Sequence, residues 1–385
     1  MEHGRYGRRD VRVLHVLNRL RASGAEVMLH AAAGQWKHHG IEVDVLAVGP
    51  EPGPFAADLR SVGYTVVHEP DGLLFRVPPR LARRVRDGGY DVVHVHTERA
   101  GFYFGLAALS AGAGVLRTVH SVFGFGGMLR IQRKLQRQVL RRMGVVHVGV
   151  SHGVADNEKR RFGNPSQVIE NWCGKEFTPP TKRQQDQARQ ALKLHDHDFV
   201  VVSVGNCAPV KRHEAILEAV AHISGLSDLV YLHVGDEDGT GKERRLAEQL
   251  GISRQVHFLG HRRPLQALHA ADVFVMTSAY EGLGLAAVEA LMTGLPLVLA
   301  DVPGLRDVAE ASPAAWLTDT GPAQLAAAIE RAADFCKSRP RMDAARSFGD
   351  RFSLQRGVAN YAEIYHQLAR SSSAHGHGSC VDGMS

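Results

Sequence analysis

The sequence predicts an α/β protein with two doubly wound, Rossmann-like domains that face each other across a cleft. Three observations lead to this prediction. The chain has 385 residues, which is enough for two domains of ordinary size. Short apolar runs alternate with helical patterns in two separate series, as in βαβ units with parallel sheets. A polar stretch without apolar periodicity separates the two series.

The first series defines an N-terminal domain over residues 1–178. Helical patterns cover Ala25–His38 and Gly101–Ala111. The predicted strands are Val11–Leu17, Val43–Val48, Val92–Val95, Leu116–Val119, Val145–Val150 and Val168–Ile169. Strands separated by helices of this length predict one parallel sheet.

The second series defines a C-terminal domain over residues 191–350, after a Pro-, Lys- and Gln-rich stretch at 179–190 that we interpret as a linker. The predicted strands are Phe199–Val204, Leu229–Val234, Val256–Leu259, Val273–Met276 and Leu297–Leu299. The predicted helices are His213–Ser224, Gly241–Leu250, Pro264–Ala270, Gly284–Met292 and Gln324–Ala333. Residues 351–370 are expected to form a terminal helix that packs back toward the N-terminal domain, and 371–385 a disordered tail.

The composition is that of an ordinary globular protein, with 44% hydrophobic and 22% charged residues. It excludes a chain that is disordered throughout, a collagen and a long coiled coil. No apolar run reaches the ~18 residues of a membrane span, and the short run after the basic N-terminus favours a strand over a signal peptide. The four scattered cysteines argue against a disulfide framework or a thiolate zinc site. We therefore expect a cytoplasmic protein.

The positive charge is concentrated in the first half of the chain. The net charge is +6, but residues 1–180 hold 25 Lys/Arg against 16 Asp/Glu, whereas the remainder holds 21 against 24. This asymmetry fits an anionic partner such as phosphate, a membrane surface or nucleic acid, and it equally fits a solubilising surface.

The segment from Val273 to Asp301 carries the most chemical information. A buried strand is followed by a polar loop with Glu281, and a helix then starts near Gly284 and carries Glu289. Glycine at a helix N-terminus exposes backbone N–H groups to a ligand, and the helix dipole favours an anion there. The two carboxylates are suited to accept hydrogen bonds from sugar hydroxyls on either side of a diphosphate.

A second segment supports this interpretation. The predicted strand Phe199–Val204 leads into GNCAPVKRHEAILEA, in which Lys211 stands just before a helix. Its ammonium could neutralise a phosphate as a point charge. Taken alone, Lys211 would be interpreted as a solvated lysine.

Together these segments resemble the retaining nucleotide-sugar glycosyltransferases of family 4, which have the GT-B fold. VGNCAPVKRHEAILEA is similar to the family's Gly-Arg-Leu-x-Pro-x-Lys-Gly segment, and SAYEGLGLAAVEALMTG to its Glu-x7-Glu segment. The resemblance extends over nearly the whole chain, with DVVHVH, TVH, VSHGVADN and VHFLGHRRPL as further similar segments.

The resemblance implies roles on the donor side of the site. Lys211 would bind the donor diphosphate together with the backbone at Gly284 and Leu285. Glu289 would accept hydrogen bonds from the ribose, and Glu281 would face the transferring sugar.

The resemblance also implies an acceptor side formed by the N-terminal domain. His120 would reach the reaction centre. Ser23 and Gly24 resemble the family's glycine-rich loop near the acceptor, with serine in place of the usual first glycine. His96 ends a strand, together with His94, and is expected to point toward the cleft.

The sequence departs from the family pattern at two further positions. Asn206 replaces the phosphate-binding arginine of the family, which loses a charge and leaves more of the neutralisation to Lys211. Asn171-Trp172 stands where the family has Asn-Gly, near the domain hinge.

Alternative interpretations of three motifs remain open. Gly282-x-Gly284-x-x-Ala287 loosely fits a dinucleotide fingerprint, but it falls late in its domain and leaves Lys211 and the two glutamates without roles. Asp236–Asp238 is either a metal-binding Asp-x-Asp or a turn with an N-cap, and the turn is favoured. The HDHD stretch at 195–198 is either a metal cluster or a solvated loop, and the loop is favoured.

The segment Leu129–Arg142 holds six Lys/Arg and no acid, with apolar residues at helical spacing. A basic amphipathic helix is typical of a surface that binds an anionic membrane, here the inner face of the cell membrane. An ordinary core helix with a solvated basic face is the alternative. No nucleic-acid motif is present, so no nucleic-acid partner is expected.

The combined prediction is a retaining, metal-independent glycosyltransferase of polysaccharide or cell-envelope biosynthesis. It would move a hexosyl-type unit from a nucleotide-diphosphate sugar to a hydroxyl of a saccharide, lipid-linked or small-molecule acceptor. No cofactor is expected, because the nucleotide sugar is a co-substrate. A sugar-nucleotide isomerase or binding protein on the same fold is the alternative, and an NAD-dependent oxidoreductase is less favoured. The sequence does not specify the base, the sugar, the acceptor or the oligomeric state.

Overall fold

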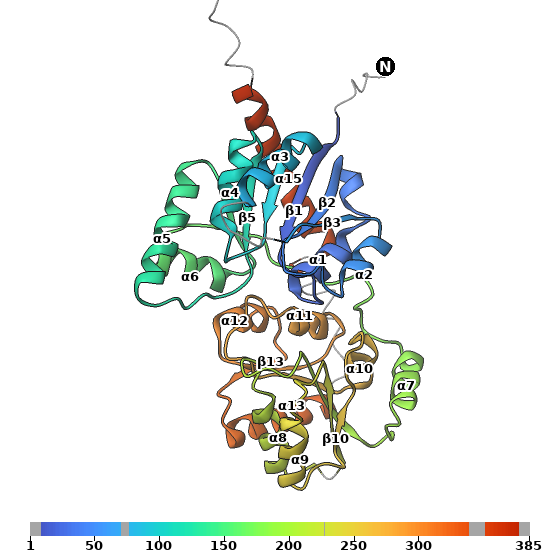
Figure 1. Cartoon of the computed structure of the whole chain (residues 1–385). Helices are drawn as coiled ribbons and strands as arrows, with labels where there is room; N and C mark the ends of the chain where they lie inside the picture. Colours follow the sequence, from blue (N-terminus) through green and yellow to red (C-terminus); the bar gives the residue numbers. More distant parts are fainter. Residues whose placement is uncertain (1–8, 71–76, 227, 339–350, 377–385) are drawn as a thin grey trace, which may run out of the picture. The chain divides into compact units, whose positions relative to one another are not determined.

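The computed structural model describes residues 9–70, 77–226, 228–338 and 351–376 (Figure 1). The chain divides into two compact units. Unit 1 comprises Met1–Gly174 and Ser353–Ser385, and unit 2 comprises Lys175–Phe352. Unit 1 is therefore built from two separate stretches of sequence, and unit 2 lies between them along the chain.

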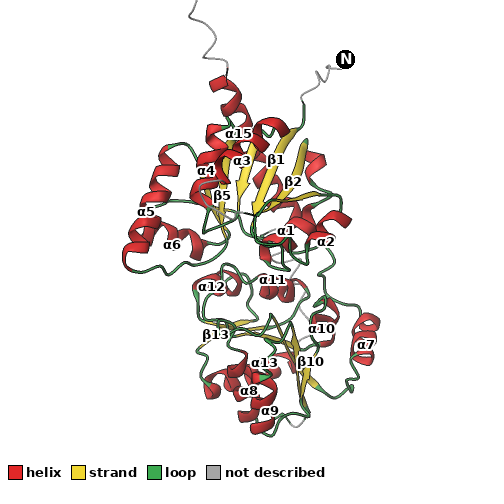
Figure 2. Ribbon diagram, in the orientation of Figure 1, coloured by secondary structure: helices red, strands yellow, loops and turns green. Residues whose placement is uncertain are grey.

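Unit 1 contains a seven-stranded sheet in the order β3-β2-β1-β4-β5-β6-β7, in which every neighbouring pair is parallel. Figure 2 draws its strands, among them β1, β2 and β5, in yellow. The strands are β1 (Val11–Leu17), β2 (Ile41–Ala47), β3 (Thr65–His68), β4 (Val92–Val95), β5 (Gly114–Val119), β6 (Val146–Gly149) and β7 (Gln167–Val168). Strand order reverses between β1 and β4. This reversal is the place where doubly wound sheets bind ligands, beyond the carboxyl ends of the strands.

Helices connect these strands. They are α1 (Gly24–Ala32), the 3₁₀ turn η1 (Trp36–His39), α2 (Ala56–Ser61), α3 (Val77–Gly88), α4 (Gly101–Ser110), α5 (Gly127–Arg142), α6 (His152–Phe162) and the terminal α15 (Leu354–Gly376). Val358, Tyr361 and Tyr365 of α15 are fully buried in the same apolar cluster as β1 and α1. The terminal helix is therefore part of the core of unit 1.

Unit 2 contains a six-stranded parallel sheet in the order β10-β9-β8-β11-β12-β13. The strands are β8 (Phe199–Val204), β9 (Leu229–Val234), β10 (Val256–Phe258), β11 (Val273–Met276), β12 (Leu297–Ala300) and β13 (Ala315–Thr318). The helices are α7 (Lys182–Ala191), α8 (His213–His222), α9 (Lys242–Gln249), α10 (Leu265–Ala270), α11 (Leu285–Met292), α12 (Pro303–Ala309) and α13 (Pro322–Ser338). Here the order reverses between β8 and β11.

The prediction of two doubly wound Rossmann-like units is confirmed. β1, β4, β8, β9 and β11 match their predicted ranges. Most positions of these strands are apolar because both faces of a parallel sheet are covered by helices; His15 in β1 and His94 in β4 are buried polar exceptions. The cleft between the domains stays a prediction.

The interpretation of 179–190 as a linker is wrong for most of its length, because α7 begins at Lys182. Thr181 and Gln184 form a capping box, which satisfies two backbone N–H groups at the helix start. Only Ala188 and Arg189 of this helix are buried. A helix with so little buried surface shows no apolar periodicity, so the polar sequence of residues 179–190 does not indicate a helix.

Two other expectations need correction. The helical pattern Ala25–His38 splits into α1 and η1, and Gly40 follows in the left-handed conformation with φ of 65°. The expected disordered tail begins too early, because α15 continues to Gly376; residues 377–385 lie outside the described residues. The helices of the described chain include no apolar segment of membrane-spanning length.

Trp172 accounts for one departure from the family pattern. Its side chain is fully buried, and its indole N–H donates to the carbonyl of Met28 in α1 (3.1 Å). On the other side, a Cβ at Gly357 of α15 would lie only 2.0 Å from the indole ring. Trp172 thus fills the space between α1 and the terminal helix, and glycine at 357 makes that space available.

Candidate functional site

Two loops of unit 2 meet where its strand order reverses. The first loop follows β8 and ends at Arg212, and the second follows β11 and ends at Gly284. Thr277 donates its hydroxyl to the carbonyls of Lys211 and Arg212, both at 2.9 Å, and the backbone N–H of Ala279 donates to Val210 (2.8 Å). The two predicted donor-side loops are therefore held together in a fixed register.

This register pairs two predicted site residues. The Lys211 ammonium donates to a carboxylate oxygen of Glu281 at 2.6 Å. The side chains are 26% and 14% exposed, so the pair is only partly screened by water. The structure thus places a cation and an anion, from loops 70 residues apart, at the carboxyl edge of the sheet.

The start of α11 has the geometry predicted for an anion site. Gly284 is the N-cap, with φ of 78°, and Leu285 is the first helical residue. A Cβ at position 284 would lie 2.5 Å from Leu305, so both conformation and space require glycine there. The first N–H groups of a helix have no partner within it, so they are available to a ligand.

Glu289 lies on α11 and is only 6% exposed. Burial, with a smaller contribution from the charge of Glu176, raises the pKa of the Glu289 carboxyl to about 8. Among the described residues Glu289 forms no ion pair, so its burial disfavours the ionised carboxylate in the ligand-free protein. Such a cost at a predicted ligand position is typical of functional sites.

Asn206 has a structural contact in addition to its predicted role. It accepts a hydrogen bond from the backbone N–H of Asp236 at 2.9 Å, which joins the ends of β8 and β9. A Cβ at the neighbouring Gly235 would lie 2.2 Å from the Gly205 carbonyl, so these strand ends are in direct backbone contact. The amide therefore organises the loop without adding charge.

The two alternative metal motifs of unit 2 form turns. Asp238 accepts hydrogen bonds from the backbone N–H and the hydroxyl of Thr240 (2.8 and 2.6 Å). Asp198 accepts from the backbone N–H of His195 at 2.7 Å. Both motifs thus have the local hydrogen bonds that the favoured turn and loop interpretations require.

In unit 1, the predicted residues His96 and His120 follow β4 and β5 and are hydrogen-bonded to each other, with 2.8 Å between His96 Nδ1 and His120 Nε2. His96 Nε2 is also 2.9 Å from His15 Nδ1 on β1. His15 Nε2 is in turn 3.2 Å from the hydroxyl of Tyr365 on α15. His120 is thus the outer member of a row of polar groups that extends into the core.

The row continues from the Tyr365 hydroxyl to His94 Nδ1 (2.7 Å), from His94 Nε2 to Thr118 Oγ1 (2.7 Å), and from Thr118 to the hydroxyl of Tyr361 (3.1 Å). We call the whole row the histidine–tyrosine chain; its members in order are His120, His96, His15, Tyr365, His94, Thr118 and Tyr361. Burial lowers the pKa of all four imidazoles, to about 3 for His15 and about 4 for His120.

Sequence reasoning missed most of this chain. The His94-x-His96 alternation was visible, but His15 was interpreted only as part of a strand. Tyr361 and Tyr365 are spaced four residues apart, so they share one face of α15. No pattern in the sequence relates that face to β1 and β4, whose His15 and His94 lie 350 and 271 residues from Tyr365.

Ser23 and Gly24 lie at the start of α1, after β1. The Ser23 hydroxyl donates to the Glu26 carboxylate within the first turn of the helix. Burial raises the pKa of Glu26. Serine thus has a defined partner at the position where the family has glycine.

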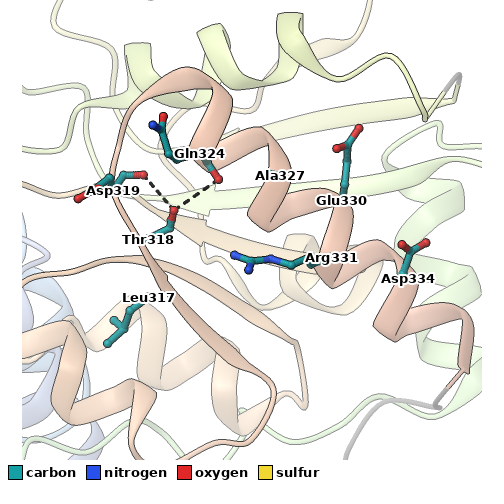
Figure 3. A pocket seen from close by; sticks show the side chains of 8 residues that line it. All are labelled: Leu317, Thr318, Asp319, Gln324, Ala327, Glu330, Arg331 and Asp334. Atoms are coloured by element: carbon teal, nitrogen blue, oxygen red, sulfur yellow. Dashed lines mark hydrogen bonds between the residues drawn. The ribbon is translucent and has the colours of Figure 1, made fainter.

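One hollow of unit 2 contains none of the predicted site residues. It has a volume of about 660 Å³ and lies between the end of β13 and α13 (Figure 3). Thr318 contributes its hydroxyl to the carbonyls of Asp319 and Gln324 there (3.1 and 3.4 Å), and charged side chains of α13 complete the lining. We assign it no role.

Comparison with known families identifies both units. Residues 22–173 match the sequence profile of Glycosyltransferase Family 4, and residues 184–346 match that of Glycosyl transferases group 1. The chain belongs to the family 4 glycosyltransferases. The two profiles cover the predicted residues of this glycosyltransferase in both units, from Ser23 to Glu289.

Two relatives have named acceptors. This glycosyltransferase is 31% identical over 253 residues to the D-inositol 3-phosphate glycosyltransferase of Corynebacterium urealyticum, covering 62% of this chain and 60% of the relative. It is 29% identical over 239 residues to the UDP-Gal:alpha-D-GlcNAc-diphosphoundecaprenol alpha-1,3-galactosyltransferase of Escherichia coli, covering 58% and 61%. Each match therefore spans about three fifths of the relative.

Among solved structures, Alr3699/HepE of Anabaena in complex with UDP and glucose has a TM-score of 0.77. The superposition covers 93% of this chain and all of that one, at 21% identity. At this identity the likeness establishes the fold. The predicted GT-B fold of this glycosyltransferase is confirmed by such neighbours.

Proposed function

We propose that this glycosyltransferase transfers a hexosyl-type unit, with retention of configuration, from a nucleotide-diphosphate sugar to a hydroxyl acceptor. One observation supports the proposal most strongly. Lys211 and Glu281 come from loops on either side of the strand-order reversal and meet beside the start of α11. A cation and a helix N-terminus are suited to a diphosphate, and the adjacent carboxylate is suited to sugar hydroxyls.

The donor would occupy unit 2 in an extended arrangement. Its diphosphate would contact Lys211 and the backbone N–H groups at Gly284 and Leu285. Its ribose would donate hydroxyl hydrogen bonds to Glu289, and Glu281 would face the sugar. Asn206 would donate its amide N–H toward the diphosphate, since its oxygen is occupied by Asp236.

The reaction breaks the bond between the anomeric carbon and the diphosphate oxygen, and forms a bond from that carbon to the acceptor oxygen. The acceptor hydroxyl loses its proton, which passes to the departing diphosphate. As the bond to the anomeric carbon breaks, its electron pair stays on the diphosphate oxygen, so negative charge builds there. Lys211 and the dipole of α11 would stabilise that charge, and His120 of unit 1 would contact the reacting sugar. We expect the reaction to need no metal ion and no cofactor.

Acceptor-dependent release of nucleoside diphosphate tests this proposal. Purified protein is incubated with a panel of nucleotide sugars, starting with UDP-glucose and UDP-galactose, with and without candidate saccharide and polyprenyl-diphosphate acceptors. Transfer requires release that increases with acceptor, and a product whose anomeric configuration matches that of the donor. Binding of nucleotide sugar without release, or its conversion to an isomer, would instead support the binding-protein or isomerase alternative.

We expect nucleotide binding to depend on pH through Glu289. The carboxyl, with its pKa of about 8 in the empty site, is mostly protonated at pH 7. Ribose hydroxyls donate to the ionised form, so binding should release a proton. Affinity should therefore rise between pH 6 and 8, by up to about tenfold per unit, and level off above 8. Calorimetry in two buffers of different ionisation enthalpy measures the released proton.

The matched variants are Glu289→Gln and Glu243→Gln, since Glu243 is a second buried glutamate of unit 2 at 5% exposure. Only Glu289→Gln should abolish proton release, with a higher donor KM. Because the folded-state pKa is raised, the native protein binds the extra proton between about pH 4.5 and 8. Its stability without ligand should fall across that window, and Glu289→Gln should remove the fall. Proton uptake on binding would contradict the assignment.

We further propose a lipid-linked acceptor, reached through α5. Leu140 is buried, but this helix exposes its other apolar side chains, among them Met128 at 78%, Ile131 at 52% and Leu135 at 57% exposure. Arg130, Lys134, Arg141 and Arg142 are exposed among them. A core helix would have the apolar side inward. Exposed apolar and cationic side chains on one helix are typical of helices that lie in a membrane interface.

Not every cation of α5 is available to a membrane. Arg137 is 2% exposed and donates to the Glu158 carboxylate at 2.7 Å, with Glu98 as a second partner at 3.1 Å. Replacing Arg137 would leave Glu158, which is fully buried, without its cation. Tests of membrane binding must therefore leave Arg137 unchanged.

Co-sedimentation with liposomes of anionic and neutral lipid tests the surface. The protein should pellet with anionic vesicles at low salt, and less at high salt. Arg130→Glu/Lys134→Glu and Ile131→Glu/Leu135→Glu should each reduce pelleting about tenfold or more. The control Arg80→Glu/Arg83→Glu makes the same charge change on α3 and should pellet normally. Protein that stays in the supernatant with anionic vesicles would favour a water-soluble acceptor.

A further inference from the structure

The histidine–tyrosine chain constrains where the protons of its members lie. Each of the six ring nitrogens of His15, His94 and His96 has a partner within the chain. A neutral imidazole has one nitrogen that donates and one that accepts. Each ring therefore passes the direction of hydrogen bonding to the next. A hydroxyl can accept twice, but Tyr365 or Thr118 would then have no acceptor within the chain for its own buried O–H. If both hydroxyls donate within the chain, it has only two arrangements.

In the first arrangement, Tyr361 donates to Thr118, Thr118 donates to His94 Nε2, and His94 Nδ1–H donates to Tyr365. Tyr365 then donates to His15 Nε2. From there His15 Nδ1–H donates to His96, and His96 Nδ1–H donates to His120 Nε2. All four histidines then carry their proton on Nδ1. In the second arrangement every bond is reversed and all four carry it on Nε2.

The groups at the two ends of the histidine–tyrosine chain decide which of the two hydrogen-bond arrangements is favoured. Among the described residues, His120 Nδ1 has no hydrogen-bond partner, and the Tyr361 hydroxyl is bonded to Thr118. Each arrangement leaves one donor unpaired at one end, either His120 Nδ1–H or the Tyr361 hydroxyl. Tyr361 is 0% exposed in the core, whereas His120 lies partly exposed at the carboxyl edge of the sheet. His120 Nδ1 is itself covered in the ligand-free structure. Its ring nevertheless lies at the partly exposed end of the chain, where a ligand that reaches the ring would satisfy the donor, whereas no ligand reaches the Tyr361 hydroxyl in the core, so the unpaired donor costs less at His120.

We infer that the six inner members of the histidine–tyrosine chain are positioning residues that present His120 to the substrate as a hydrogen-bond donor through Nδ1. His120 then recognises an oxygen atom of the reacting sugar or acceptor and does not remove a proton from it. The inference rests on the proposed function for the role of His120, but the tautomer itself is a property of unit 1 alone.

A metal ion is the competing use of the same rings. One nitrogen from each of His15, His94 and His96 lies within 4.8 Å of the others. A metal bound there would have to replace hydrogen bonds that already satisfy these nitrogens. The hydrogen-bonded arrangement keeps all of these bonds, so it is favoured over a metal site.

Nuclear magnetic resonance of protein with ¹⁵N-labelled histidine reads the tautomers directly. Single His→Gln variants assign the signals. Ligand-free protein at pH 7 should show His15, His94, His96 and His120 all with the proton on Nδ1, which is the minor form of free histidine in water. Any of the four with its proton on Nε2 would overturn the inference. So would one equivalent of Zn²⁺ that shifts the signals of His15, His94 and His96 together.

Two tyrosines of α15 give a matched pair of variants, because both are fully buried and each loses one hydroxyl. Tyr365→Phe removes the link between His15 and His94, so His15 and His120 should show mixed tautomers. Tyr361→Phe leaves Thr118 to donate to His94, so all four should keep the proton on Nδ1. Mixed tautomers in Tyr361→Phe, or none in Tyr365→Phe, would contradict the proposed direction of hydrogen bonding from Tyr361 to His120.

Kinetics connect the tautomer to the reaction. We expect kcat to fall about tenfold in Tyr365→Phe, the effect of one lost hydrogen bond, with the donor KM unchanged, and less than about twofold in Tyr361→Phe. At the site itself, His120→Asn places an N–H where Nδ1 stands and should retain more activity than His120→Gln. Wild-type protein without transferase activity would refute the proposed function, while the spectra would still decide the tautomer.

Discussion

Replacing Lys211 by Met is expected to weaken the binding of a nucleoside diphosphate by ten- to hundredfold. A charge-assisted hydrogen bond is worth about 1.5–3 kcal/mol. Asn206 adds no charge at this edge, so the other positive potential that we assign to the diphosphate comes from the start of α11. Methionine keeps the length of the side chain and its apolar packing. Calorimetry with UDP, and with the matching nucleoside as a ligand without phosphate, measures the effect.

The matched control is Lys242→Met. Lys242 also pairs with a glutamate of unit 2, Glu214, at 2.7 Å, but its side chain is 58% exposed. Its loss should leave the affinity for UDP unchanged within about twofold, because exposed ion pairs contribute little. If Lys211→Met bound UDP as tightly as wild type, or lost affinity for the nucleoside equally, Lys211 would not be the phosphate contact.

Replacing Glu281, the partner of Lys211, should have the opposite effect on binding and a large effect on turnover. In Glu281→Gln, Lys211 loses the carboxylate that competes with the diphosphate for its ammonium. Affinity for UDP should therefore stay the same or rise a few-fold. The carboxylate would face the transferring sugar, where positive charge develops as the bond breaks. Its loss should lower kcat by about 10²–10³, the usual effect of removing such electrostatic stabilisation.

Steady-state and single-turnover kinetics separate these effects. The decrease should be in kcat, while KM for the donor is unchanged or lower. The ratio between the UDP affinities of Glu281→Gln and Lys211→Met should be at least as large as the ratio between wild type and Lys211→Met, because Glu281→Gln is not expected to weaken UDP binding. A Glu281→Gln enzyme with normal kcat and a raised KM would show that this carboxylate binds the donor in its ground state only.

Most strands of the two sheets could be predicted because they are short, mainly apolar runs separated by helical patterns. α7 could not, since it buries two residues and thus lacks a periodic apolar face. β13, which was not predicted, has no fully buried residue, so its apolar pattern is weak. A periodic apolar pattern arises only where one side of a helix or strand is buried, so elements with little buried surface cannot be predicted from it.

Within the site, the loops after β8 and β11 were predictable because Gly284 precedes a predicted helix, and because the segments with Lys211, Glu281 and Glu289 resemble the motifs of the family. Their direct pairing was not, because Lys211 and Glu281 meet only when β8 and β11 become neighbours in the sheet. The histidine–tyrosine chain depends in the same way on contacts between β1, β4, β5 and α15. The amphipathic pattern of α5 was recognised, but only the structure shows that its apolar side is exposed and that Arg137 faces inward.

The return of α15 to unit 1 has a consequence for how the protein is made. The core of unit 1 includes Val358, Tyr361 and Tyr365, which leave the ribosome only after all of unit 2. Unit 2 is one continuous stretch and can complete its core first, although most of unit 1 precedes it. We therefore expect unit 2 to complete its fold before unit 1, the reverse of the usual N-to-C order of domain folding during synthesis. Until α15 is made, His15 and His94 lack the tyrosine hydroxyl that they share in the complete protein. A chain that ended at Phe352 would contain the whole of unit 2 but would lack the helix that completes the core of unit 1.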